Sequence, residues 1–248
     1  MEWITDPQVW FGFFTLTALE IVLGVDNIVF ISILAGKLPA HQRRGARRLG
    51  LLLAMGSRIL LLFSLSWVIG LTAPLFSMMG GEISGRDLVL ILGGLFLVAK
   101  STHEIHDKLE GDTGHKSAAV APSYTSVLVQ ILLLDMVFSL DSVITAVGMV
   151  QQIGVMVAAV IVAVGFMMLF ADAISGFVDK HPTVKMLALS FLLMIGVMLI
   201  ADGFGHHVPK GYIYFAMAFS VFVELLNLRA RRHEPPVKLH RPYVEEGS

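Results

Sequence analysis

Seven long runs of apolar residues constrain the fold of this chain more than any other feature. About 20 consecutive apolar residues are enough for an α-helix to cross the hydrocarbon core of a bilayer. Only 15% of the residues are charged, against about 25% in soluble domains. The sequence therefore predicts an all-α polytopic membrane protein with seven transmembrane helices. Their approximate ranges are 9–35, 49–71, 88–106, 125–150, 154–178, 183–201 and 212–228.

Composition excludes several classes of function. The sequence contains no cysteine, which rules out disulfides, thiolate metal sites and cysteine nucleophiles. A net charge of −1 provides no basic excess for binding nucleic acid. No phosphate-binding loop, nucleotide fingerprint or HExxH motif is present. We expect no prosthetic group and a lipid bilayer as partner, while the oligomeric state stays open. Residues 1–8 carry no Lys or Arg, so we expect a retained first span rather than a signal peptide.

The distribution of basic residues predicts the orientation of the chain. Of the 18 Lys and Arg residues, 15 fall on one side of the expected membrane, and only Arg86 and Lys210 fall on the other. The remaining one, Arg58, lies within the second apolar run. Cytoplasmic segments carry the excess of Lys and Arg in membrane proteins. The N-terminus is therefore expected outside, the C-terminus in the cytoplasm, and residues 233–248 as a disordered cytoplasmic tail.

An acidic motif occurs twice within the apolar runs. Residues 19–27 read Leu-Glu-Ile-Val-Leu-Gly-Val-Asp-Asn, and residues 134–142 read Leu-Asp-Met-Val-Phe-Ser-Leu-Asp-Ser. In both copies the two acids are six positions apart, and the copies are separated by 115 positions. Carboxylates inside a membrane segment are costly and usually functional. The repetition therefore predicts an intramembrane cation site.

Further landmarks extend this repetition to two halves of the chain. With nearly the same offset, Arg58 corresponds to Asp172, and residues 92–100 resemble residues 194–202. Each half has three expected helices, so the halves must insert with opposite topology, as in many transporters. We therefore predict a single transmembrane domain over 1–232. It comprises a first repeat at 9–106, a second inverted repeat at 125–201 and an extra helix at 212–228.

The spacing within each motif leaves two arrangements open. A helix advances about 100° per residue, so Glu20 and Asn27 share a face while Asp26 points about 120° away. Either the two motif helices unwind near Gly24 and Ser139, which would free backbone carbonyls as ligands, or one acid of each pair binds the cation. The other acid would then pair with a basic residue such as Arg58.

The side chains of the two motifs form an oxygen-rich ligand set. Such hard ligands suit Mg²⁺, Ca²⁺ or Mn²⁺. The predicted metal site consists of Glu20, Asp26, Asn27, Asp135, Asp141 and Ser142. The secondary candidates are Arg58 as an acid's partner, Asp172 along the path, Met136 as a thioether ligand and Glu224. Lys100 and Glu104 are expected to pair with each other, and His206 and His207 to be solvated in an outer loop.

The two motifs, the basic segment ending at Arg47-Arg48-Leu49-Gly50 and the ending Glu224-Leu225-Leu226-Asn227 resemble the TerC family of integral membrane proteins. The resemblance covers about residues 5–232 and is nearest to short bacterial members, which places the chain in the inner membrane. It implies a lysine-exporter-like transporter built from three-helix inverted repeats. It further implies Mn²⁺ efflux at the six motif residues, with Mn²⁺ as substrate.

Two rival functions remain beside secondary transport. Other TerC members are linked to membrane-protein assembly and to metal resistance, so the acids could be structural pairs in a scaffold. Asp26 and Asp141 could also face one another as in an intramembrane aspartyl protease, although we expect no enzyme. Convergence of the acids on a water-reachable cavity favours transport, whereas sealing against a basic residue favours a scaffold.

Overall fold

A computed structural model describes residues 7–78, 81–110, 122–150 and 152–230. The side chains of a few helical residues, Asp26 and Asp141 among them, are outside this description, as is the expected tail at 233–248. The chain divides into two compact units, one formed by residues 1–74 and 122–175 and the other by 75–121 and 176–248. Each unit is considered by itself below.

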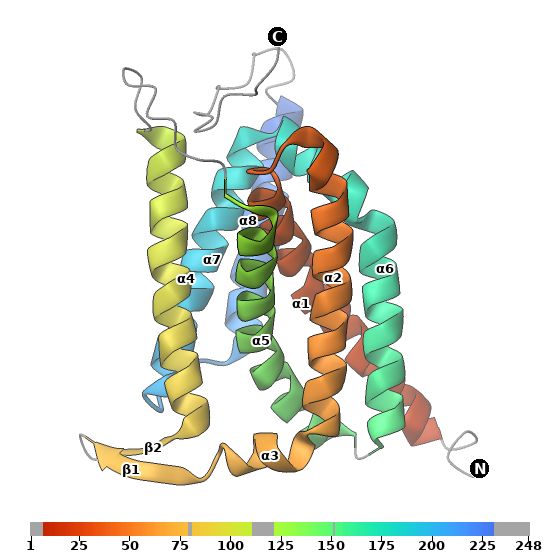
Figure 1. Ribbon diagram of the computed structural model, residues 1–248, viewed down its shortest axis with the longest axis vertical. Helices are drawn as coiled ribbons and strands as arrows, with labels where there is room; N and C mark the ends of the chain where they lie inside the picture. Colours follow the sequence, from red (N-terminus) through yellow and green to blue (C-terminus); the bar gives the residue numbers. More distant parts are fainter. Residues whose placement is uncertain (1–6, 79–80, 111–121, 151, 231–248) are drawn as a thin grey trace. The chain divides into compact units, whose positions relative to one another are not determined.

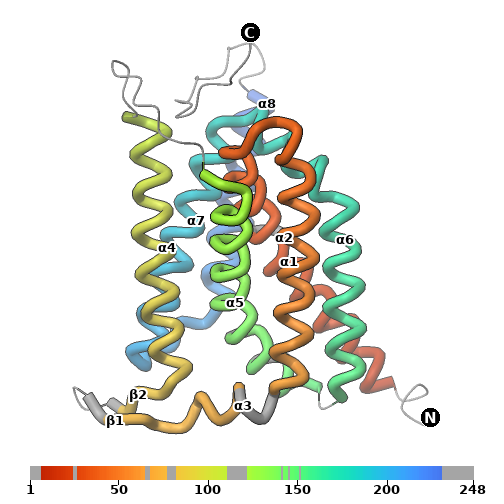
Figure 2. Tube along the Cα trace, in the orientation of Figure 1, coloured from red at the N-terminus to blue at the C-terminus, as the bar shows by residue number. Residues whose placement is uncertain are grey.

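The first unit is built from long helices, two of which run in one direction and two in the other. Figure 1 shows α2 and α5 running side by side in the same direction, with α1 and α6 running in the opposite one. Figure 2 gives the same course for the Cα trace. The short α3 turns away from the end of α2. The elements are α1 (Pro7–Ala35), α2 (Ala40–Phe63), α3 (Leu65–Gly70), α5 (Tyr124–Met149) and most of α6 (Ile153–Lys180).

Small residues on α2 permit its close packing against α5. The buried face of α2 includes Ala46, Gly50, Ala54 and Ser57, which recur at three- or four-residue spacing. A Cβ on Gly50 would lie only 3.1 Å from the side chain of Ile131 on α5. Arg58 lies on the same buried face of α2, so the packing of its neighbours places its charged side chain in the interior.

The second predicted helix differs from the observed one at both ends. We expected it at 49–71, but α2 begins at Ala40, directly after Pro39, and ends at Phe63. The apolar pattern missed the first turns because they are rich in arginine, which is a good helix former. It extended too far because α3 is also apolar, although it is a separate helix.

The second unit contains the remaining helices and one small sheet. A capping box formed by Ser84 and Asp87 starts α4 directly after the sheet. The two strands are a local exception to the all-α prediction. The elements are β1 (Pro74–Met78), β2 (Gly81–Ser84), α4 (Gly85–Leu109), α7 (Pro182–Gly203) and α8 (Lys210–Ala230).

Helices α4 and α7 pack tightly and in opposite directions (Figure 1). A Cβ on Gly94 would lie 2.6 Å from the carbonyl oxygen of Gly196, and a Cβ on Gly196 would lie 2.9 Å from that of Gly94. Only glycine permits two backbones to approach this closely. The contact is reciprocal, since Gly94 also faces Ile200 and Gly196 faces Val98.

Six of the described helices are long and apolar enough to cross a membrane. They are α1, α4, α5, α6, α7 and α8, and α2 is not among them. The reason lies in the composition of α2, which carries four arginines in its first turns and Arg58 in its last third. The prediction of an all-helical membrane protein is confirmed, while the crossing by α2 stays a prediction.

Candidate functional site

Three helices of the first unit bring polar residues to one buried point. Glu20 lies on α1, Arg58 on α2 and Asp135 on α5, each within an otherwise apolar buried stripe. Glu20 is flanked on its face by Leu16 and Gly24, one turn away on either side. The regular period of the apolar residues therefore fixes the direction in which each ionised side chain points.

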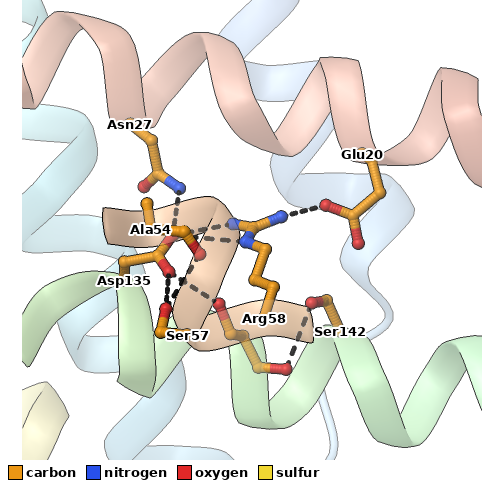
Figure 3. Close-up of polar contacts among 8 residues, drawn as sticks. Glu20, Asn27, Ala54, Ser57, Arg58, Asp135 and Ser142 are labelled. Carbon is orange, nitrogen blue, oxygen red and sulfur yellow. Dashed lines mark hydrogen bonds and ion pairs between the residues drawn. The ribbon is translucent and has the colours of Figure 1, made fainter. Parts of the chain in front are cut away.

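The guanidinium of Arg58 lies between the two acids (Figure 3). Its Nη1 donates to Oε2 of Glu20. Its Nε and Nη2 donate to Oδ1 of Asp135 at 3.2 and 3.1 Å. The first acids of the two motifs, 115 positions apart, are thus held by a single cation. This matches the second of the two arrangements left open by the sequence.

Asp135 accepts more hydrogen bonds than Glu20 does. Besides the guanidinium, its Oδ2 accepts from the hydroxyls of Ser57 and Ser139, at 2.9 and 3.0 Å. The amide of Asn27 donates to Oδ1 over a longer distance of 3.4 Å. Both oxygens of this buried side chain therefore have hydrogen-bond partners. Neither Ser57 nor its contact with Asp135 was predicted, although its position next to Arg58 in an apolar run is a usable signal.

Burial and charge make this cluster energetically demanding. The side chains of Arg58, Glu20 and Asp135 are 3%, 9% and 5% exposed. Desolvation of buried ions costs several kcal/mol each, which only close pairing and hydrogen bonding offset. With all three groups ionised, two carboxylates meet one guanidinium, which leaves an excess of one negative charge. The pairing of these acids with Arg58 therefore does not neutralise both carboxylates.

A narrow cavity of about 10 Å³ adjoins Glu20 and Arg58. That volume is roughly the space one water molecule needs. Its other walls are apolar and come from the part of each helix remote from the arginine-rich start of α2. They are Leu16, Leu62, Val143, Ala146, Met156, Ala159 and Val160. The cluster is therefore bordered by a small space on one side.

Both motif helices are continuous in this structure. α1 is helical from Pro7 to Ala35 and α5 from Tyr124 to Met149. α1 is also continuous at Gly24, and the side chain of Met167 on α6 packs directly against this glycine. The hydroxyl of Ser139 is occupied by Asp135. In this conformation neither helix is unwound.

The structure brings together only part of the predicted metal site. Glu20, Asn27 and Asp135 gather around Arg58, while Ser142 is buried near them and donates to the carbonyl of Ser139 at 3.2 Å. The side chains of Asp26 and Asp141 lie outside the described residues. Among the described side chains, no three His, Cys, Asp or Glu residues are close enough to hold a metal ion. The hydroxyl and amide oxygens nearby suit a hard cation, but Arg58 occupies the space between the acids.

Two of the other secondary candidates, Asp172 and Met136, do not join this cluster. Asp172 on α6 accepts from Arg44 and Arg47 at 2.9 Å each, with Arg48 at 3.9 Å, so it ties α6 to the start of α2. Met136 is 41% exposed, whereas its neighbour Asp135 is buried. Glu224 lies on α8, in the second unit.

The second unit contains two further buried acids. Glu104 is fully buried and pairs with Lys100 at 3.0 Å, as expected from their spacing. Asp202 at the end of α7 is also buried, and Nδ1 of His207 lies 3.0 Å from its Oδ1. The prediction that His207 is solvated is confirmed by its 74% exposure, while its contact with Asp202 was not predicted. Asp202 precedes His207 by only five positions, and α7 ends between them at Gly203.

Comparison with known proteins gives the wider context of this cluster. The family described as "Integral membrane protein TerC family" matches residues 5–237. The chain belongs to the TerC family. A TerC-type relative from Haemophilus influenzae, "UPF0053 protein", is 57% identical over 232 residues, which cover 93% of this chain and 98% of the relative. No solved structure matches the chain.

Two relatives from Escherichia coli are similar to this TerC chain over 94% of its length. "UPF0053 inner membrane protein YgdQ" is 55% identical over 233 residues, with 94% of this chain and 98% of the relative covered. "UPF0053 inner membrane protein YoaE" is 52% identical, but the match covers only 45% of its length. These names specify a membrane and no substrate. The predicted family is confirmed, and nothing in it indicates catalysis.

Proposed function

We propose that this TerC protein is a secondary transporter of the inner membrane that exports a divalent cation, with Mn²⁺ as the best candidate. The site would comprise the acids and neighbouring oxygens of the two motifs: Glu20, Asp26, Asn27, Asp135, Asp141 and Ser142. Carboxylates bind either a proton or a divalent cation, so proton exchange at the same groups would drive export. Oxygen ligands of this kind favour Mg²⁺, Ca²⁺ and Mn²⁺.

One observation carries the proposal. Glu20 and Asp135, the first acids of the two motifs, meet at one buried cation between α1, α2 and α5. An excess of carboxylate within helices long enough to span a bilayer is costly unless it has a function. We propose that the cation route passes the small cavity beside Glu20, which has about 10 Å³ of space.

The packing of the helices supports an inverted repeat with seven crossings. Within the first unit, α1 runs opposite to α5 and α2 opposite to α6 (Figure 1). In the second unit α4 runs opposite to α7, and their reciprocal contact joins Gly94 to Gly196. The predicted repeat relates the same pairs of helices: α1 to α5, α2 to α6 and α4 to α7. α2 would then be the seventh crossing, with Arg58 neutralised by acids.

The proposed orientation places the arginine-rich start of α2 in the cytoplasm. Asp172 binds Arg44 and Arg47 at this end. The cavity lies toward the opposite, external end of α1, α2, α5 and α6. The N-terminus would then be external and the C-terminus cytoplasmic, in agreement with the positive-inside rule.

A membrane scaffold is the second candidate, favoured by the completeness of the ion pairing. Both Glu20 and Asp135 are sealed against Arg58, as expected of structural acids. The two functions differ in a direct assay. Purified protein reconstituted in liposomes should move Mn²⁺ when an opposing pH gradient is applied, with Ca²⁺, Mg²⁺, Zn²⁺ and tellurite as comparisons. A scaffold would move none of them.

A further inference from the structure

The position of Arg58 raises the question of how a cation could bind at all. The guanidinium donates to Glu20 and to Asp135 at the same time and is only 3% exposed. A divalent cation bound between these carboxylates would need the space that the guanidinium fills. Arg58 and the cation therefore exclude one another.

We propose that Arg58 is a built-in competitor of the exported cation, which occupies the cation's place in the unloaded protein and is displaced when the cation binds. This inference rests on the proposed function and specifies how the same site is controlled. The unloaded site is never left with two unpaired carboxylates in an apolar surrounding, where their desolvation would be most costly.

Electrostatic attraction favours replacement of the Arg58 guanidinium by a divalent cation. One guanidinium leaves an excess of one negative charge on Glu20 and Asp135, whereas a divalent cation neutralises both. Asp135 is prepared for both states, because Ser57 and Ser139 hold its Oδ2 while Arg58 binds only Oδ1. Displacement of the guanidinium would free Oδ1 without disturbing the other oxygen.

The neighbouring side chain of Asn27 can serve either occupant. Its Nδ2 now donates to Oδ1 of Asp135. An amide carries both donors and an acceptor oxygen, so rotation of the group would present that oxygen to a cation. The same residue thus supports the arginine-bound and the cation-bound arrangement.

The position of the cavity indicates the direction in which the Arg58 side chain would move when it is displaced. It adjoins Glu20 and Arg58 and is otherwise apolar, with about 10 Å³ of space. A guanidinium cannot enter such a volume unless the surrounding ends of α1, α2, α5 and α6 separate. Release of Arg58 by the incoming cation would therefore favour opening at this end, which is the external end in the proposed orientation. The exchange would thereby couple loading to outward release.

Removal of the competitor tests the proposal. Mn²⁺ binding to purified protein is measured by isothermal titration calorimetry, and Mn²⁺ flux is measured in liposomes. Arg58→Gln should bind Mn²⁺ at least about tenfold more tightly than wild type, yet show lower flux because the guanidinium no longer helps to displace the ion. Arg58→Lys keeps the charge but loses the fork that reaches both acids, so its affinity should lie between the two. Arg48→Gln, ten residues earlier on α2 and about half-exposed, is the control and should bind as wild type does.

The outcomes separate this inference from the function on which it rests. Wild-type protein that neither binds nor moves Mn²⁺ would overturn the proposed function. Wild-type flux combined with unchanged or weaker binding by folded Arg58→Gln would overturn the competitor alone. If Arg58→Gln does not purify as a monodisperse protein, Arg58→Lys decides: tighter binding supports the proposal, and equal or weaker binding overturns it.

Discussion

Gly94 of α4 and Gly196 of α7 face one another reciprocally, each with its Cα side against the other's carbonyl oxygen. The two residues are 102 positions apart and occupy equivalent places in the segments 92–100 and 194–202. A reciprocal contact of this kind is what a local two-fold axis between antiparallel helices produces. The contact joins the helices that we predict to be the third of each repeat.

Gly94→Ala should destabilise the protein by about 1–3 kcal/mol, the usual cost of overpacking. The reason is that its Cβ would come within 2.6 Å of a backbone carbonyl, which cannot rotate away. Thermal unfolding in detergent measures the effect. Gly176→Ala is the matched control, because its Cβ meets nothing within 4 Å. Equal melting temperatures for both variants would contradict the close contact.

Asp135→Asn should destabilise the protein more than Glu20→Gln does. Asp135 accepts from both Arg58 and two serine hydroxyls, whereas the contact from Arg58 to Glu20 comes from one nitrogen. Breaking a buried pair typically costs about 3–5 kcal/mol, and we expect Asp135→Asn in that range. Folded yield and unfolding in detergent are the measurements. The reverse order of stability would show that the cluster is centred on Glu20 instead.

Asp26→Asn and Asp141→Asn should abolish Mn²⁺ flux in liposomes while the protein still inserts and purifies. Each substitution keeps the size of the side chain and removes an anionic ligand from a medium of low dielectric, where its attraction is least screened. Asp179→Asn is the control, since Asp179 is partly exposed and pairs with Lys185. Wild-type flux in both variants would remove these aspartates from the mechanism. Loss of folded protein would favour the scaffold.

His207→Ala should lower the melting temperature in detergent by about 2–8 °C, which corresponds to about 1–2 kcal/mol in a chain of this size. The side chain of Asp202 is 1% exposed, and its carboxylate oxygens accept no hydrogen bond from the described residues. Loss of the imidazole would leave this buried carboxylate without its neighbouring partner. His206→Ala, one position earlier and exposed, should have little effect. Equal effects from both would assign the stabilisation to the loop rather than to the pair.

A reporter fused after Ser248 should be cytoplasmic, and one fused before Met1 should be external. The expectation follows from the excess of Lys and Arg on one side of the expected membrane. Paired fusions that are active only in the cytoplasm or only outside it measure the orientation. A C-terminus on the external side would contradict the seven crossings and the inverted repeat together.

The sequence by itself determined the class of protein, most helix positions and the residues of interest. Apolar runs of about 20 residues are a local property, so α4 to α8 were predicted to within a few residues of their observed ends. The repeated acids were visible for the same reason. The predicted start of α2 was wrong because arginines at positions 43–48 interrupt the apolar signal without interrupting the helix.

Only the tertiary structure decided which side chains meet. Glu20, Arg58 and Asp135 are separated by 38 and 77 positions, and their convergence depends on small residues that let α2 approach α5. The sequence left open whether the motif helices unwind or whether an acid pairs with Arg58, because both satisfy the same carboxylates. Helix packing selected the ion pair, since it buried Arg58 between Glu20 and Asp135, which compensate its desolvation.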